Sequence, residues 1–162
     1  RIVAQTRNHI KIIANYDSGD NINVDTVINI IPKNKDFSVK YLLGILNSKF
    51  ASYYLYNFVY NRAVRSMNFE YVKFLPIKKT AMSKQNEIVK LVNSILDNKK
   101  ELIQIGKKME KLTQIEEEHI NLTKKKLQLE GEINENEKKL DMHVYEIYGL
   151  SDREIKEVKE LE

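Results

Sequence analysis

A short basic segment near the middle of the chain carries side chains that are suited to reading DNA. It consists of Asn61, Arg62, Arg65, Ser66 and Asn68. In the major groove arginine can make two hydrogen bonds to guanine, and asparagine can make two to adenine. One such contact is worth about 1–3 kcal/mol of discrimination between bases. We therefore interpret these five residues as candidate DNA-binding residues.

Basic residues on either side of this segment are better suited to phosphates than to bases. They are Lys73, Lys78 and Lys79 downstream, and Arg7 and Lys11 upstream. Contacts to phosphate add affinity that is independent of sequence and that weakens with salt. Arginine and asparagine are also common in ordinary surface loops. The residue types alone therefore leave both interpretations of the basic segment open.

The charge of the chain is distributed unevenly. The 162 residues include 27 Lys and Arg against 23 Asp and Glu, for a net charge of +4. Basic residues dominate up to Lys79, whereas Glu and Lys alternate beyond Ser83. The first pattern favours a polyanionic partner, and the second is typical of a solvated helix surface. The chain lacks cysteine and any long apolar run, so we expect a cytoplasmic protein without a membrane partner.

The sequence predicts no catalysis by this chain. A methyltransferase that acts on adenine needs an Asn-Pro-Pro-Tyr-type motif and a glycine-rich loop, but the two prolines, Pro32 and Pro76, are far apart. Glu154-Ile-Lys156 has the letters of a nuclease motif but lies in a helical pattern. Glu116 and His119 alone cannot complete a metal site. We expect no catalytic residue, no metal ion and no cofactor in this chain.

The front half has the pattern of strands followed by a helix. Short β-branched segments at 10–15 and 26–31 flank a turn-forming cluster that begins at Asp17. Further strands are predicted at 2–5 and 69–75. Apolar residues at helical spacing predict one helix from Leu42 to Phe58, with Ser38 as its N-cap. We therefore predict an α+β fold, with a small mixed β-sheet packed on a long helix.

The back half predicts a long helical hairpin or coiled-coil extension. A helix opening at Ser83 has apolar residues at alternating spacings of three and four, with Asn98 in the same seam. A turn within 113–123 would let a second helix fold back on the first, and dimerisation through the seam is the alternative. Gly149 is predicted to end the second helix, and Ser151 with Glu154 forms a capping box for a terminal one.

Four blocks of sequence resemble a known family. They are Tyr41-Leu-Leu-Gly-Ile-Leu-Asn-Ser-Lys49 followed by Tyr53-Tyr54, Tyr71-Val-Lys-Phe-Leu-Pro-Ile77, Gln85-Asn-Glu-Ile-Val-Lys-Leu-Val92, and Leu140-Asp-Met-His-Val-Tyr-Glu-Ile-Tyr-Gly-Leu150. In this order they resemble the C-terminal, TaqI-like target-recognition domain of adenine-specific DNA methyltransferases and of fused type II restriction-modification enzymes.

The resemblance implies a module that selects a site on double-stranded DNA. A separate N-terminal methyltransferase domain of the same polypeptide, joined in fused enzymes by a nuclease domain, would perform the chemistry with S-adenosylmethionine. Arg62 and Arg65 would reach bases or phosphates from the loop after the central helix. Asn47 and Ser48 would satisfy backbone groups of adjoining strands, and Gly44 would permit close approach of helix to sheet.

These interpretations divide the chain into three parts. Residues 1–82 would be the C-terminal part of the α+β recognition domain, 83–150 the hairpin or coiled-coil arm, and 151–162 a terminal capping helix. The alternative is a coiled-coil docking module, as in a type I specificity subunit, with a dimer or subunit contact through the arm. A third reading is an RNA-binding module that stacks bases on its tyrosines.

Overall fold

Helices dominate the protein. The computed structural model describes residues 2–6, 9–19, 29–33, 36–59, 72–112 and 117–160. The helices are α1 (Val39–Asn47), α2 (Lys49–Tyr54), the π-helical turn η1 (Leu55–Val59), α4 (Met82–Met109), α5 (Glu117–Tyr148) and α6 (Asp152–Lys159). Two short strands, β1 (Ile2–Thr6) and β2 (His9–Ile12), precede them.

The predicted α+β fold is wrong, because the fold is all-α in class and its core lies between helices. Strands β1 and β2 form a two-stranded antiparallel hairpin, and the described residues contain no larger sheet. Of the segment 26–31, residues 29–31 are described and are not in a strand. Residues 72–75, predicted to end a strand, form a turn closed by the Leu75 N–H and the Val72 carbonyl at 3.1 Å. Short β-branched segments fit a strand locally, but packing decides whether one forms.

The predicted central helix is also interrupted. Ser48 has extended backbone angles, φ −69° and ψ 153°, and separates α1 from α2. Its hydroxyl donates to the Ile45 carbonyl at 2.6 Å and accepts from the Ala51 N–H at 3.2 Å. Serine competes with the helix backbone for hydrogen bonds in this way. The residue therefore acts as the N-cap of α2, which lets α2 turn away from α1.

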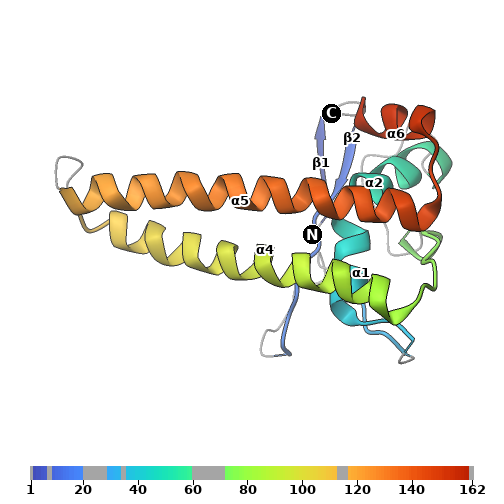
Figure 1. The fold of residues 1–162 in the computed structure, drawn as a ribbon, viewed down its shortest axis with the longest axis horizontal. Helices are drawn as coiled ribbons and strands as arrows, with labels where there is room; N and C mark the ends of the chain where they lie inside the picture. Colours follow the sequence, from blue (N-terminus) through green and yellow to red (C-terminus); the bar gives the residue numbers. More distant parts are fainter. Residues whose placement is uncertain are drawn as a thin grey trace.

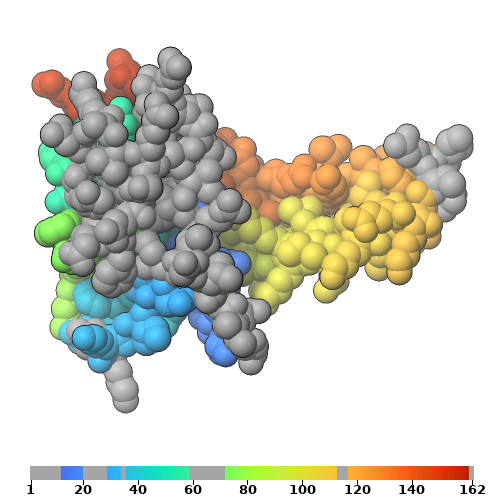
Figure 2. Space-filling view, turned by 180° about the vertical axis from the view of Figure 1, so that it is seen from behind, coloured from blue at the N-terminus to red at the C-terminus, as the bar shows by residue number. Residues whose placement is uncertain are grey.

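The two longest helices form an antiparallel arm that projects from the rest of the molecule (Figures 1 and 2). Lys84 pairs with Glu146 at 2.6 Å near the base, and Lys99 pairs with Glu137 at 3.2 Å further out. The Asn98 amide donates to Glu132 at 3.1 Å at an exposed edge, instead of lying within a buried seam. The arm thus closes within one chain.

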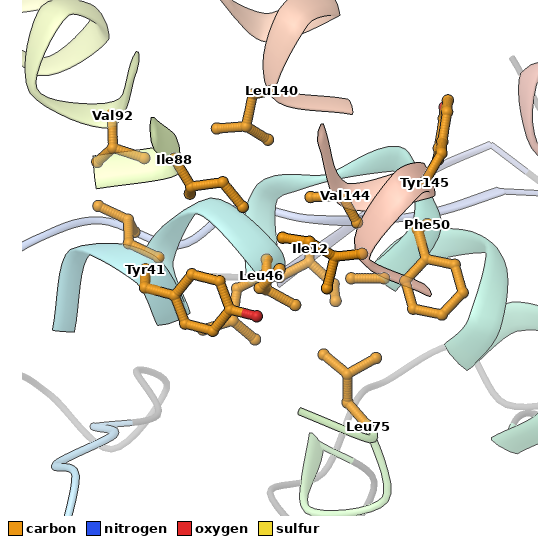
Figure 3. Packing of buried hydrophobic residues seen from close by; sticks show 14 of the residues in the cluster. Ile12, Tyr41, Leu46, Phe50, Leu75, Ile88, Val92, Leu140, Val144 and Tyr145 are labelled. Carbon is orange, nitrogen blue, oxygen red and sulfur yellow. The ribbon is translucent and has the colours of Figure 1, made fainter. Parts of the chain in front are cut away.

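The core lies where α1 and α2 cross the base of the arm. Ile45, Ile88 and Val144 are completely buried there, and they belong to a cluster that includes Tyr41, Phe50 and Leu140 (Figure 3). A Cβ at Gly44 would lie 2.5 Å from Ile88 Cγ2 and 3.2 Å from Val92 Cγ2. Gly44 thus permits a close approach, as predicted, but the approach is to α4 and not to a sheet.

The end of α5 follows the sequence prediction. Gly149 has a φ of 69°, and the Leu150 N–H donates to the Tyr145 carbonyl at 3.0 Å, which closes the helix. Ser151 and Glu154 then form a complete capping box at the start of α6. Both the capping glycine and the capping box are confirmed.

Candidate nucleic-acid interface

The predicted base-reading residues lie outside the part of the chain that the structure describes. These are Asn61, Arg62, Arg65, Ser66 and Asn68, and the same holds for Arg7. Lys11 lies in β2, but its side chain is also outside the described part. The structure does describe both flanks of the segment 60–71. One flank is α2 with η1, and the other is the stretch from Val72 to Lys79.

The first flank is held by packed aromatic rings. The Tyr54 ring centroid lies 6.0 Å from that of Phe50 and 5.2 Å from that of Phe58. The Tyr53 hydroxyl donates to Glu157 of α6 at 3.1 Å. Burial, followed by the bond to Glu157, raises the pKa of Tyr53. These contacts fix the end of α2 against the rest of the protein.

Two tyrosine hydroxyls hold the second flank by its backbone. The Tyr148 hydroxyl donates to the Pro76 carbonyl at 2.5 Å and accepts from the Lys78 N–H at 3.3 Å. The hydroxyl of Tyr41, which is completely buried, donates to the Lys78 carbonyl at 2.8 Å. Burial, with a smaller effect from Tyr148, raises the pKa of Tyr41 to about 12. Burial also raises the pKa of Tyr148.

Helix α5 connects the two flanks. Asp141, which is buried, accepts a 2.9 Å hydrogen bond from the Lys49 N–H at the start of α2. A carboxylate is favourable there because a helix N-terminus is electropositive. Seven residues further along the same helix, the Tyr148 ring lies 4.1 Å from the Phe50 ring. One helix therefore positions both sides of the basic segment.

The three lysines of the second flank have exposed side chains in different surroundings. The Lys73 ammonium lies 5.4 Å from the centre of the Phe74 ring. The Lys79 ammonium pairs with Asp36 at 3.0 Å. Exposed ion pairs contribute about 0–1 kcal/mol, so this pair leaves Lys79 able to exchange Asp36 for a phosphate. The backbone of Lys78, by contrast, is fixed on both its N–H and its carbonyl.

Comparison with known families gives a match over the front part of the chain. Residues 1–77 match the model of the TaqI-like C-terminal specificity domain. This part of the chain is similar to that family. The family resemblance predicted from the sequence is thus confirmed over these residues, which include the whole basic segment. Neither a curated protein nor a solved structure matches the chain.

The specificity domain is completed by helices outside the matched residues. Gln85 of α4 is buried, and its amide donates to the carbonyls of Asp36 at 3.0 Å and Thr80 at 3.2 Å. Residue-level reasoning missed both Gln85 and Asp141 as positioning residues. Each lies in one of the blocks of family resemblance, and that position was the signal available.

Asn47 binds backbone groups, as predicted, although the groups follow strand β2 and do not belong to it. Its amide oxygen accepts from the Ala14 N–H at 2.9 Å, and its amide nitrogen donates to the Ala14 carbonyl at 3.1 Å. Asn47 thereby satisfies the backbone that follows β2. Ser48 serves α2 instead of a strand, so the prediction for Ser48 is wrong in its partner.

The described residues contain no group of three or more His, Cys, Asp or Glu side chains arranged to hold a metal ion. None of their helices has the length and apolar character that a membrane span requires.

Proposed function

We propose that this chain is the sequence-specific duplex DNA recognition module of a restriction-modification enzyme. The family match over residues 1–77 carries the proposal, because a specificity domain is the part that selects a sequence. In this proposal the parent is an adenine-specific DNA methyltransferase, alone or fused to an endonuclease. The catalytic residues and S-adenosylmethionine then belong to an N-terminal domain of the same polypeptide, and this chain performs no chemistry of its own.

The anchoring of the flanks supports this role. Base readout requires side chains that are held within a fraction of an ångström of the productive geometry. Asp141 and Tyr148 fix the two flanks from one helix, with hydrogen bonds at 2.9 and 2.5 Å. In the proposed complex Arg62 and Arg65 contact bases, while Lys73, Lys78 and Lys79 contact phosphates.

The test is a comparison of two charge-matched double variants. Duplexes selected from a random library by the wild-type chain, and scrambled duplexes of the same composition, would be titrated at several salt concentrations. Arg62→Ala with Arg65→Ala is expected to abolish the preference for the selected duplexes. Lys107→Ala with Lys108→Ala removes the same charge from the last turn of α4 and is expected to preserve the preference. Unchanged selectivity in the arginine variant would exclude these residues as readers.

The arm supports a second candidate function, a docking or dimerisation module. Three large apolar side chains on it are exposed, Ile103 by 61%, Ile120 by 47% and Leu127 by 63%. Sedimentation of the wild-type chain alongside an Ile103→Lys, Leu127→Lys variant tests this candidate. If the wild-type chain is a dimer and the variant is a monomer, the result supports docking between two copies of the chain. If both are monomers, the result argues against docking between copies.

A further inference from the structure

A continuous series of aromatic rings runs from the core to the surface beside the basic segment. Tyr148 contacts Phe50 with ring centroids 4.1 Å apart, Phe50 contacts Tyr54 at 6.0 Å, and Tyr54 contacts Phe58 at 5.2 Å. Phe58 also meets Tyr53 edge-on at 6.3 Å. The inner rings are held by packing, so Phe58 at the outer end has a supported position.

Phe58 is much more exposed than the rings beneath it. Its exposed fraction is 68%, whereas Phe50 is 8% exposed and Tyr148 is half-buried. A single exposed apolar residue is ordinary on a protein surface. Phe58 differs because it tops a supported series of rings and lies in a π-helical turn, a feature that is frequent at functional sites. Its outer face is therefore available to a flat apolar ligand.

The surroundings of this ring favour a nucleic acid. Phe58 comes two residues before the segment 60–71, which contains Arg62 and Arg65. On the other flank, Phe74 is 57% exposed, and the Lys73 ammonium lies 5.4 Å from its ring centre. Exposed aromatic rings next to cations are the combination that holds a base by stacking and a phosphate by charge.

We propose that Phe58 stacks on a nucleobase of the DNA that this chain binds. This inference rests on the proposed DNA-binding function and adds a contact of another kind. Such a ring enters at a base step that is already weakened and partly unstacks it. Four tyrosines are poorer candidates for this role, because Tyr41 and Tyr145 are buried and Tyr53 and Tyr54 are half-buried.

The experiment compares variants of Phe58 in the full 162-residue chain. Phe58→Ala and Phe58→Leu remove the aromatic face, whereas Phe58→Tyr keeps it. Met142→Ala is the control, because Met142 is 52% exposed on α5 and has no part in either proposed contact. Binding would be measured on selected duplexes that carry 2-aminopurine at each position in turn, because the fluorescence of this base rises when it unstacks. The same titrations on single-stranded DNA show whether Phe58 stacks on a base of a duplex or on a base of a single strand.

If Phe58 stacks on a base, the alanine and leucine variants weaken binding about tenfold to a hundredfold, the usual effect of losing one stacked base. The salt dependence is unchanged, because no phosphate contact is lost. One position in the duplex shows a fluorescence change that the tyrosine variant retains. Wild-type affinity in the alanine variant, with selective binding intact, would overturn the inference and leave the proposed function standing.

Two other outcomes would also test the inference and the proposed function. A chain that ignores duplexes but binds single strands through Phe58 would support stacking on a base and reject duplex recognition. A chain that binds neither form of DNA would reject both the inference and the proposed function. Thermal unfolding of each variant verifies that the fold is retained.

Discussion

The Tyr148 hydroxyl is bonded to the Pro76 carbonyl at 2.5 Å across 72 residues of sequence. The bond joins the last turn of α5 to the end of the matched specificity domain. The hydroxyl also accepts from the Lys78 N–H at 3.3 Å, so one side chain satisfies two backbone groups. The geometry of the second flank therefore depends on a helix that lies outside the family match.

Removing this hydroxyl is expected to loosen the second flank. Tyr148→Phe keeps the ring contact with Phe50 but leaves the Pro76 carbonyl without this donor. The free energy of unfolding should fall by about 1 kcal/mol, the usual value for one such hydrogen bond, as measured by urea denaturation. Tyr54→Phe is the control, since the Tyr54 hydroxyl makes no hydrogen bond to the described residues, and its removal should change stability little. Equal losses in both variants would contradict the role assigned to Tyr148.

The buried carboxylate of Asp141 is expected to stabilise the start of α2. Asp141→Ala removes the acceptor for the Lys49 N–H and should cost about 1–2 kcal/mol in unfolding free energy, as for other helix caps. Asp97→Ala is the matched control, because Asp97 is exposed and pairs only with Lys100 at 3.6 Å within α4. Its effect should stay near zero. A cost in the control as large as that of Asp141→Ala would refute a specific capping role.

Two glycines should respond to the same substitution with opposite signs. A Cβ at Gly44 would lie 2.5 Å from Ile88 Cγ2, whereas a Cβ at Gly131 in α5 has no neighbour within 4 Å. Gly44→Ala should destabilise by about 1–3 kcal/mol through overpacking. Gly131→Ala should stabilise by about 0.5–1 kcal/mol, because alanine favours the helix. Thermal unfolding of both variants measures this, and a stable Gly44→Ala protein would mean that α1 and α4 can separate without cost.

Alkaline pH should unfold the protein partly through Tyr41. Burial raises its pKa from 10.0 to about 12. The folded protein therefore keeps the phenolic proton between these values, while the unfolded chain loses it. Stability from this group is fully present below pH 10 and is lost as the pH rises towards 12, by on the order of 2 kcal/mol.

The measurement for Tyr41 is urea denaturation at pH values across that window. Tyr41→Phe is expected to be less stable at every pH, because it loses the hydrogen bond to the Lys78 carbonyl. The quantity to compare is therefore the slope of the unfolding free energy against pH. The slope should be shallower in Tyr41→Phe than in wild type, and Tyr16→Phe, which alters an exposed ring, should retain the wild-type slope. Identical slopes in all three proteins would rule out Tyr41 as a source of the pH dependence.

Local signals in the sequence were sufficient for several features and insufficient for others. The capping box of Ser151 and Glu154, and the glycine that ends α5, depend on residues within one turn, so their sequence signature decides them. The strand at 26–31 was predicted from β-branched content, and the one at 69–75 from aromatic and apolar residues ahead of Pro76. Both signals describe a fit to a half-buried surface and not a backbone preference. The described residues of these two segments, 29–31 and 72–75, are not in strands, and the sheet of the described part is the hairpin of β1 and β2.

The break at Ser48 shows why the candidate site was only partly predictable. Periodicity continued through this residue, but Ser48 caps α2 with its own hydroxyl, and the Lys49 N–H that follows is satisfied by Asp141, 92 positions further along the chain. No local pattern reveals such a partner. The predicted readers Arg62 and Arg65 remain predictions. Of the rings that precede them, Tyr53 and Tyr54 are half-buried, whereas Phe58 is exposed.

The antiparallel course of α4 and α5 has a consequence for how such proteins can vary. The chain leaves the globular end along α4 and returns along α5. The two ends of the arm at the globular part therefore keep their positions whatever the length of the arm. Equal insertions of whole heptads into the two helices would lengthen the projection while leaving Ile88, Leu140 and Tyr148 where they are. The distance spanned by the arm and the sequence chosen by the domain could thus diverge independently among relatives.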